Sequence, residues 1–214
     1  MSAGIAMPVL VVLAAYLLGS VSGALVIGAL RGGIDIRTQG SGNAGGTNAL
    51  RTQGIAFAVG VVIIDLGKGW LAAAWLPVVA QRFGATTAWL PAACAFAAML
   101  GHVWPVWHGF RGGKGAATLV GALLALSPGL LGVVLGVWLL MVVLFGFVGL
   151  ASVAAAIALP VAVAFGRVAP FGPLLGFGIA AAMLVAFTHR ANLARMRAGT
   201  EPRARRLWLA GRGR

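Results

Sequence analysis

Residues 129–147 read GLLGVVLGVWLLMVVLFGF, an apolar run without a single charged side chain. An α-helix of about 20 such residues spans the hydrocarbon core of a bilayer. The whole 214-residue chain has this character, because 61% of its residues are hydrophobic, only 9% are charged and the mean hydropathy is +1.01. The composition excludes a water-soluble globular fold, intrinsic disorder and a collagen-like structure. It predicts an all-α polytopic membrane protein.

Apolar stretches bounded by charged residues, Gly or Pro predict about seven transmembrane helices. The fourth stretch has only about 12 residues, which at ~1.5 Å per residue is too short to cross the hydrocarbon core. We expect a half-helix or re-entrant element there, ending in a turn at Ser127-Pro128-Gly129. No basic segment precedes the first stretch, which is longer than a signal-peptide core and should remain as a transmembrane helix. The stretches are 4–30, 55–81, 87–107, 116–127, 129–147, 150–166 and 169–188.

Basic residues outnumber acidic residues by 16 to three, for a formal net charge of +13. With the N-terminus outside and the short element counted as a crossing, thirteen basic residues face the cytoplasm, whereas only Arg82 and Arg167 face outside. The positive-inside rule therefore predicts a cytoplasmic C-terminus. Residues 191–214 form a basic cytoplasmic tail, and we expect its part beyond Asn192 to bind anionic lipid and contribute no chemistry. This distribution explains the charge without nucleic acid as a partner.

The single cysteine, Cys94, lies inside an apolar stretch. It allows neither an intrachain disulfide nor a cysteine-rich metal site, so we expect a small core residue. The sequence also carries no metal-ligand cluster, nucleophile elbow or dinucleotide fingerprint. We therefore predict that the protein uses no metal and no cofactor.

Three polar segments lie on the predicted cytoplasmic side, and the first is GSGNAGGTNALR at residues 40–51. Its glycines can turn backbone N–H groups inward, and its hydroxyl, amide and guanidinium groups are donors that a phosphate oxyanion requires. A flexible surface loop has the same composition, so composition alone leaves both interpretations open. The candidate phosphate ligands are Ser41, Gly42, Asn43, Thr47, Asn48 and Arg51.

The second polar segment, residues 101–118, contains GGKG directly before the short fourth helix. A helix N-terminus and a Lys ammonium would converge there, which makes a second anion site at the membrane surface. Positive-inside anchoring also accounts for the basic residues, but it leaves the glycines around the lysine unexplained. The candidate ligands are His102, Gly112, Gly113 and Lys114.

The third polar segment follows the last apolar stretch. If it is helical, His189, Asn192 and Arg195 lie at i, i+3 and i+6 on roughly one face. A solvated or structural imidazole remains the alternative for a lone histidine. Asp65 and Lys68, in the second apolar stretch, are also three residues apart, and each would cost ~2.5–3.5 kcal/mol alone at mid-helix. We expect them to pair or to face the site.

Together the three segments indicate a site for a phosphorylated cytosolic solute. An enzyme and a membrane transporter or binding protein for such a solute both fit this description. A transporter would be expected to have inverted repeats and a site near the bilayer midplane. The sequence shows no evident repeat and its polar motifs lie at one interface, which favours an enzyme.

The order of these motifs resembles the integral-membrane acyl-phosphate:glycerol-3-phosphate acyltransferases of bacteria, the PlsY family. The resemblance covers most of the chain. It rests on Leu18-Gly19-Ser20, the Ser-Gly-Asn…Thr-Asn…Arg loop, Asp65-Leu66-Gly67-Lys68-Gly69, the Gly-His…Pro…Gly-Gly-Lys-Gly segment, Leu150-Ala151-Ser152 and the final His-Arg…Asn.

The resemblance implies that residues 1–190 form a single seven-helix transmembrane catalytic domain. The implied enzyme lies in the bacterial cytoplasmic (inner) membrane with its active site facing the cytoplasm. It transfers an acyl chain from acyl phosphate to glycerol 3-phosphate, giving lysophosphatidic acid and inorganic phosphate for phospholipid biosynthesis. Membrane lipids are implied partners, as is the enzyme that produces acyl phosphate.

Carried over by position, the resemblance implies that Ser41, Arg51 and Lys114 bind phosphate, with Ser152, His189 and Asn192 as the later motif residues. The catalytic group would comprise His189, Asn192, Lys114 and Arg51. An acyl phosphate has an easy leaving group, so the protein mainly has to position two polyanions, and either His189 or a substrate phosphate could be the base. The sequence departs from the family pattern at Gly46, Ser22 and Ala191, where Ala, Pro and an acidic residue are common.

Overall fold

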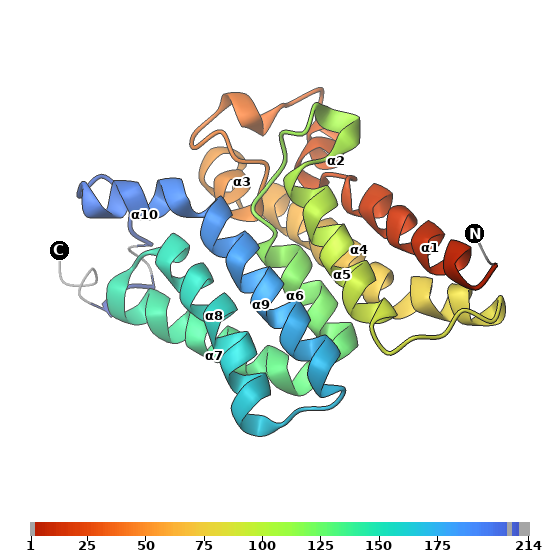
Figure 1. Cartoon of the computed structure of the whole chain (residues 1–214). Helices are drawn as coiled ribbons and strands as arrows, with labels where there is room; N and C mark the ends of the chain where they lie inside the picture. The colour runs from red at the N-terminus through yellow and green to blue at the C-terminus, as the bar shows by residue number, and fades with distance from the viewer. Residues whose placement is uncertain (1–2, 205–206, 210–214) are drawn as a thin grey trace. The chain divides into compact units, whose positions relative to one another are not determined.

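The computed structural model describes residues 3–204 and 207–209, which form an all-helical protein (Figure 1). No strand occurs in these described residues, so the predicted all-α fold is confirmed there. Two compact units, Met1–Leu126 and Ser127–Arg214, divide the chain and are described separately. Arg205, Arg206, Arg212 and Arg214 of the predicted tail lie outside the described residues.

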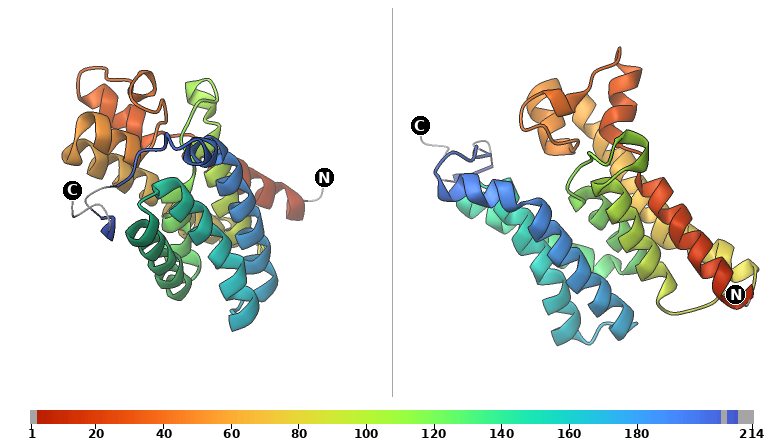
Figure 2. Two further views of the ribbon diagram at one scale, coloured as in Figure 1. Left: turned by 90° about the vertical axis from the view of Figure 1, so that its left-hand side faces the viewer. Right: turned by 45° about the horizontal axis from the view of Figure 1, so that its top comes forward.

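Helix α4 (Ile55–Arg82) is the central helix of the first unit. It packs against α1, α2, α3, α5 and α6, whereas α1 also packs against α5 (Figures 1 and 2). The other elements of this unit are α1 (Ala3–Gly19), α2 (Gly23–Leu30), η1 (Ile36–Thr38), α3 (Gly46–Gln53), α5 (Leu90–Val103), η2 (Val106–His108) and α6 (Ala116–Leu126).

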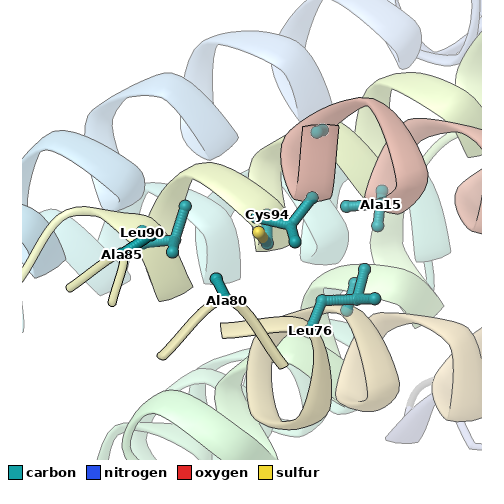
Figure 3. Close-up of a cluster of buried hydrophobic side chains, with 10 residues drawn as sticks. Ala15, Leu76, Ala80, Ala85, Leu90 and Cys94 are labelled. Carbon is teal, nitrogen blue, oxygen red and sulfur yellow. The ribbon is translucent and has the colours of Figure 1, made fainter. Parts of the chain in front are cut away.

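Small side chains allow α1, α4 and α5 to approach closely. Figure 3 shows Ala15, Ala80 and Cys94 among the residues of one buried apolar cluster, which confirms that Cys94 is a small core residue. A Cβ atom on Gly101 of α5 would overlap the Tyr16 carbonyl oxygen of α1. Glycine at such a position lets two helix backbones come into contact, as is common in membrane bundles.

The second unit is built around α8 (Val148–Gly166), which packs against α7 (Pro128–Phe145) and α9 (Phe171–Thr188). A short helix, α10 (Arg190–Arg197), follows α9 and packs against α8 and α9. Ser127 precedes α7 in an extended conformation, and Pro128 occupies the first turn. The predicted turn after the fourth apolar stretch is therefore confirmed at Ser127.

The helices follow the predicted apolar stretches, except that the first stretch is broken and the third, predicted over 87–107, is α-helical only from Leu90 to Val103 before η2. Five of the described helices are long and apolar enough to cross a membrane, or six when the bent pair α1 and α2 counts as one span. Helix α6 is the shorter apolar element expected at 116–127. The number of helices that cross the bilayer, and the division of the chain at residue 190, stay predictions.

The prediction of one continuous helix over 4–30 is wrong. This stretch forms two helices, α1 and α2, which meet at an angle of 47°. A buried ion pair on α4 forms hydrogen bonds with the backbone at the break. Lys68 Nζ donates to the Val21 carbonyl at 2.7 Å, and the Gly23 N–H donates to Asp65 Oδ1 at 3.2 Å. The predicted pairing of Asp65 with Lys68 is confirmed, at 3.0 Å. Charges on a neighbouring helix thus stabilise a break that the apolar sequence does not show.

Candidate active site

The first two polar segments lie at the same end of the first unit (Figure 1). Helix α4 begins directly after the first segment, and the antiparallel helix α5 returns the chain to the second segment. The two segments are close, since a Cβ on Gly113 would lie 3.0 Å from the Ala44 carbonyl oxygen. The structure therefore brings together two candidate phosphate-binding segments that lie about 60 residues apart in the sequence.

Only half of the first segment is a loop, because residues from Gly46 onward form α3. Asn48, in this helix, is buried and organises the loop before it. Its Oδ1 accepts the Ser41 N–H at 2.9 Å, and its Nδ2 donates to the carbonyls of Ile36 and Gln39, each at 3.0 Å. These contacts favour a structural role for Asn48 over the predicted direct binding of phosphate.

The exposed residues of this segment remain available for a ligand. Ser41, Gly42, Thr47 and Arg51 are exposed, and Asn43 is half-buried. Arg51 lies in the last turn of α3. Gly42 has a φ of +70°, a left-handed conformation that glycine adopts without strain, so the loop turns sharply next to Ser41.

The N–H groups of the glycines before Lys114 have backbone acceptors within the protein, which disfavours their predicted contact with an anion. The Gly112 N–H donates to the Val103 carbonyl at 3.2 Å, and the Gly113 N–H donates to the His102 carbonyl at 3.0 Å. A side chain on Gly113 would overlap His102 Nε2. The N–H groups that lack helical acceptors belong to the first turn of α6, which begins at Ala116, two residues after the half-buried Lys114.

His102 lies beneath this segment instead of facing a ligand. It is 4% exposed, and its Nδ1 lies 3.4 Å from Asp65 Oδ1, within ion-pair range but without hydrogen-bond geometry. Its backbone carbonyl and its ring both contact Gly113. These contacts favour a role for His102 in supporting the glycine segment over the predicted direct binding of phosphate.

In the second unit, His189 lies at the junction of α9 and α10 and is buried. Its Nδ1 lies 2.9 Å from the Val185 carbonyl oxygen, which can only accept a hydrogen bond. Because a carbonyl oxygen only accepts, the ring donates from Nδ1 to it, and this contact orients the imidazole. Helix α10 confirms that the third segment is helical after His189.

Asn192 and Arg195 of α10 converge on Glu201, a residue for which the sequence analysis assigned no role. Asn192 Nδ2 donates to Glu201 Oε1 at 2.6 Å, and Arg195 Nε donates to Oε2 at 2.8 Å. The Glu201 side chain is only 2% exposed. The expectation that the tail beyond Asn192 contributes no chemistry stays a prediction, although Glu201 of this tail contacts the candidate residue Asn192. An acidic residue four positions after the last arginine of the basic helix was the only available sequence signal.

Ser152 lies on α8, one turn after Gly149, where a Cβ atom would meet the Asn192 side chain. The Ser152 hydroxyl donates to the Val148 carbonyl at 2.9 Å and accepts a longer contact from Trp138 Nε1 at 3.4 Å. Ser152 and Asn192 thus belong to one end of the second unit. Their predicted contact with substrate stays a prediction.

A hollow of about 330 Å³ in the first unit lies at the end of α4 that is opposite its two polar segments. It is lined by residues from the end of α4 and the start of α5, among them Pro77, Gln81, Thr86 and Leu90. No charged side chain lines it, so it lacks the cations that favour a phosphorylated ligand. Within the described residues, no group of three or more His, Cys, Asp or Glu side chains is arranged to hold a metal ion.

Known proteins are similar to this chain over almost its whole length. The model of a family described as glycerol-3-phosphate acyltransferase matches residues 9–199. Glycerol-3-phosphate acyltransferase of Synechococcus elongatus is 45% identical over 202 residues, covering 91% of this chain and 93% of the relative. The same-named protein of Ralstonia nicotianae is 42% identical over 192 residues, covering 89% and 90%.

Two solved structures share the fold. One is a crystal structure of PlsY, an integral membrane glycerol 3-phosphate acyltransferase, in its glycerol 3-phosphate form. It is 35% identical and has a TM-score of 0.82, with 92% of this chain and 94% of that chain covered. The lysophosphatidic acid form of PlsY is 34% identical with a TM-score of 0.80 over the same shares.

Proposed function

The chain belongs to the glycerol-3-phosphate acyltransferase family, and from that premise we propose that it transfers an acyl chain from an acyl phosphate to glycerol 3-phosphate, releasing lysophosphatidic acid and inorganic phosphate. It is a multi-pass membrane acyltransferase. The observation that carries the choice of substrate and product is the similarity to PlsY in forms named for glycerol 3-phosphate and lysophosphatidic acid. The alternative of a transporter has no comparable support.

The first unit supplies cations and donors suited to phosphate groups. Arg51 in the last turn of α3 can donate two parallel hydrogen bonds to a phosphate, while Lys114 is a compact charge next to the first turn of α6. Ser41 adds an exposed hydroxyl in a loop that Asn48 holds in place. We assign phosphate binding to Ser41, Arg51, Lys114 and the first-turn amides of α6.

The reaction asks mainly for orientation and charge stabilisation. A hydroxyl oxygen of glycerol 3-phosphate attacks the acyl carbon, the bond between that carbon and the phosphate oxygen breaks, and inorganic phosphate leaves with the electron pair. The hydroxyl proton passes to His189 Nε2 or to a phosphate oxygen, whose second pKa near 6 suits neutral pH. A covalent enzyme intermediate is unnecessary, because phosphate is already a good leaving group.

The placement of basic residues supports an orientation in the membrane. Both phosphate-binding segments and the basic tail fall on the side that carries most of the Lys and Arg residues, which the positive-inside rule assigns to the cytoplasm. In a bacterium this side of the inner membrane gives access to soluble glycerol 3-phosphate. An enzyme that makes acyl phosphate is the expected supplier of the second substrate.

Substitution of Arg51 and Lys114 tests this assignment. Each of Arg51→Ala and Lys114→Ala should lower kcat/KM for glycerol 3-phosphate by roughly tenfold to a few hundredfold, because each removes a charge-assisted contact worth ~1.5–3 kcal/mol. Purified variants are assayed with acyl phosphate and glycerol 3-phosphate at subsaturating concentrations. Arg82→Ala is the control, since Arg82 lies at the opposite end of α4. Folded Arg51 and Lys114 variants with wild-type kcat/KM would overturn the assignment.

A further inference from the structure

Arg37 connects the two phosphate-binding segments of the first unit. Its Nη1 donates to the His108 carbonyl at 3.0 Å and to the Arg111 carbonyl at 3.2 Å. Arg37 precedes the first segment, whereas these two carbonyls lie within the second, at Arg111 directly before Gly112 and at His108 four residues before Gly112. The contact therefore joins parts of the chain more than 70 residues apart.

Asp35 orients the guanidinium before it reaches these carbonyls. Arg37 Nη2 donates to Asp35 Oδ2 at 2.7 Å, and Nε lies 3.0 and 3.1 Å from the two carboxylate oxygens. Asp35 Oδ1 also accepts the Arg37 backbone N–H at 2.9 Å, as the cap of η1. The hydrogen bond from the Arg37 side chain holds the pKa of the Asp35 carboxyl below its ordinary value, so the pair is ionised at neutral pH.

The turn that Arg37 contacts is conformationally demanding. Gly109 has a φ of +65° and Phe110 a φ of +58°, so two successive residues are left-handed. A non-glycine residue in this region is strained and persists where surrounding contacts hold it. Arg37 contacts the carbonyls on both sides of these two residues. It is thus placed to fix the turn that delivers Lys114.

We propose that Arg37 is a positioning residue for substrate binding, which holds the Lys114 segment in register with the Ser41–Arg51 segment. This inference rests on the proposed function, in which both segments bind phosphate. Nearly all N–H groups of the Arg37 guanidinium are already used within the protein, so it acts through the segments rather than by touching substrate. Its planar fork is required, because a Lys ammonium cannot contact the carboxylate and both carbonyls with the same geometry.

The test compares Arg37→Lys and Arg37→Gln with Arg31→Gln, a control at an exposed arginine just after α2. Steady-state assays give kcat and KM for glycerol 3-phosphate, and amide hydrogen exchange reports residues 105–113. Both Arg37 variants should raise KM about tenfold or more, with a smaller change in kcat, and speed exchange in that turn. The control should change neither. Wild-type KM and exchange in Arg37→Lys would overturn the positioning role.

A double variant separates this inference from the proposed function. If Arg37 acts by placing Lys114, then Arg37→Gln should raise KM much less in a Lys114→Ala background than in the wild type. Fully additive effects of the two changes would overturn the inference. Lys114→Ala and Arg51→Ala that both leave kcat/KM unchanged would instead overturn the phosphate-binding assignment, and absence of acyl transfer by the wild-type protein would overturn the proposed function. Faster exchange in Arg37→Gln would in either case still report the contact itself.

Discussion

At the scale of single residues, His189 has a defined orientation. Its Nδ1 lies 2.9 Å from the Val185 carbonyl oxygen, an acceptor, and this contact fixes the ring plane. We propose that His189 orients substrate while a phosphate oxygen takes the proton, because the easy leaving group asks little of a base.

Substitution of His189 separates the two roles. If His189 positions substrate, His189→Asn should retain much of the activity, with less than a ~10³-fold loss in kcat, because the amide can still donate a hydrogen bond. The ascending limb of the pH profile between pH 5.5 and 8.5 should also remain. A larger loss in His189→Asn together with a flattened profile would show that His189 is the general base. His189→Ala gives the reference for loss of both functions.

At the scale of elements, α10 and the chain after it form one folded unit. Glu201 accepts from Asn192 and Arg195, and the Ala204 N–H donates to the Gly146 carbonyl at 2.8 Å, between α7 and α8. The Arg203 guanidinium lies 4.8 Å from the Phe147 ring centroid. The part of the tail from Glu201 to Ala204 is therefore packed against α10, which carries Asn192, and against the junction of α7 and α8.

Truncation of the tail tests whether this packing supports activity. Removal of all residues after Arg197 should lower kcat/KM by roughly tenfold or more, because Asn192 and Arg195 lose charge-assisted contacts worth ~1.5–3 kcal/mol each. Glu201→Gln should have a smaller effect, since its amide oxygen can still accept a hydrogen bond. Removal of 210–214 alone is the control for loss of terminal charge. Unchanged activity in a folded truncation after Arg197 would return the tail to a purely lipid-binding role.

At the scale of the whole molecule, the distribution of charge predicts how the protein sits in the membrane. A chain with 16 Lys and Arg residues against three acids resists translocation of its basic segments. A reporter that functions only in the cytoplasm, fused after Arg214, should therefore be active in intact bacteria. A periplasmic reporter at the same position should be inactive, and the reverse pattern would contradict the predicted orientation.

The sequence alone determined the helical class, the approximate limits of the apolar elements and the polar segments that carry candidate ligands. Hydrophobic length and the pairing of backbone groups inside a helix are properties of neighbouring residues, so they can be read from one stretch at a time. The pairing of Asp65 with Lys68 was predictable for the same reason, because a spacing of three residues brings side chains together on a helix.

Only the tertiary structure decided which distant residues form hydrogen bonds with one another. The break between α1 and α2 is stabilised by Asp65 and Lys68, more than 40 residues away, so the apolar sequence around it looked continuous. The N–H groups of Gly112 and Gly113 were predicted to bind an anion, but the backbone of α5 already accepts them. Glu201 looked like one acid in a solvated basic tail, and it is buried because two side chains of α10 converge on its carboxylate. Each outcome depends on hydrogen-bond partners that folding brings together, which local sequence patterns do not specify.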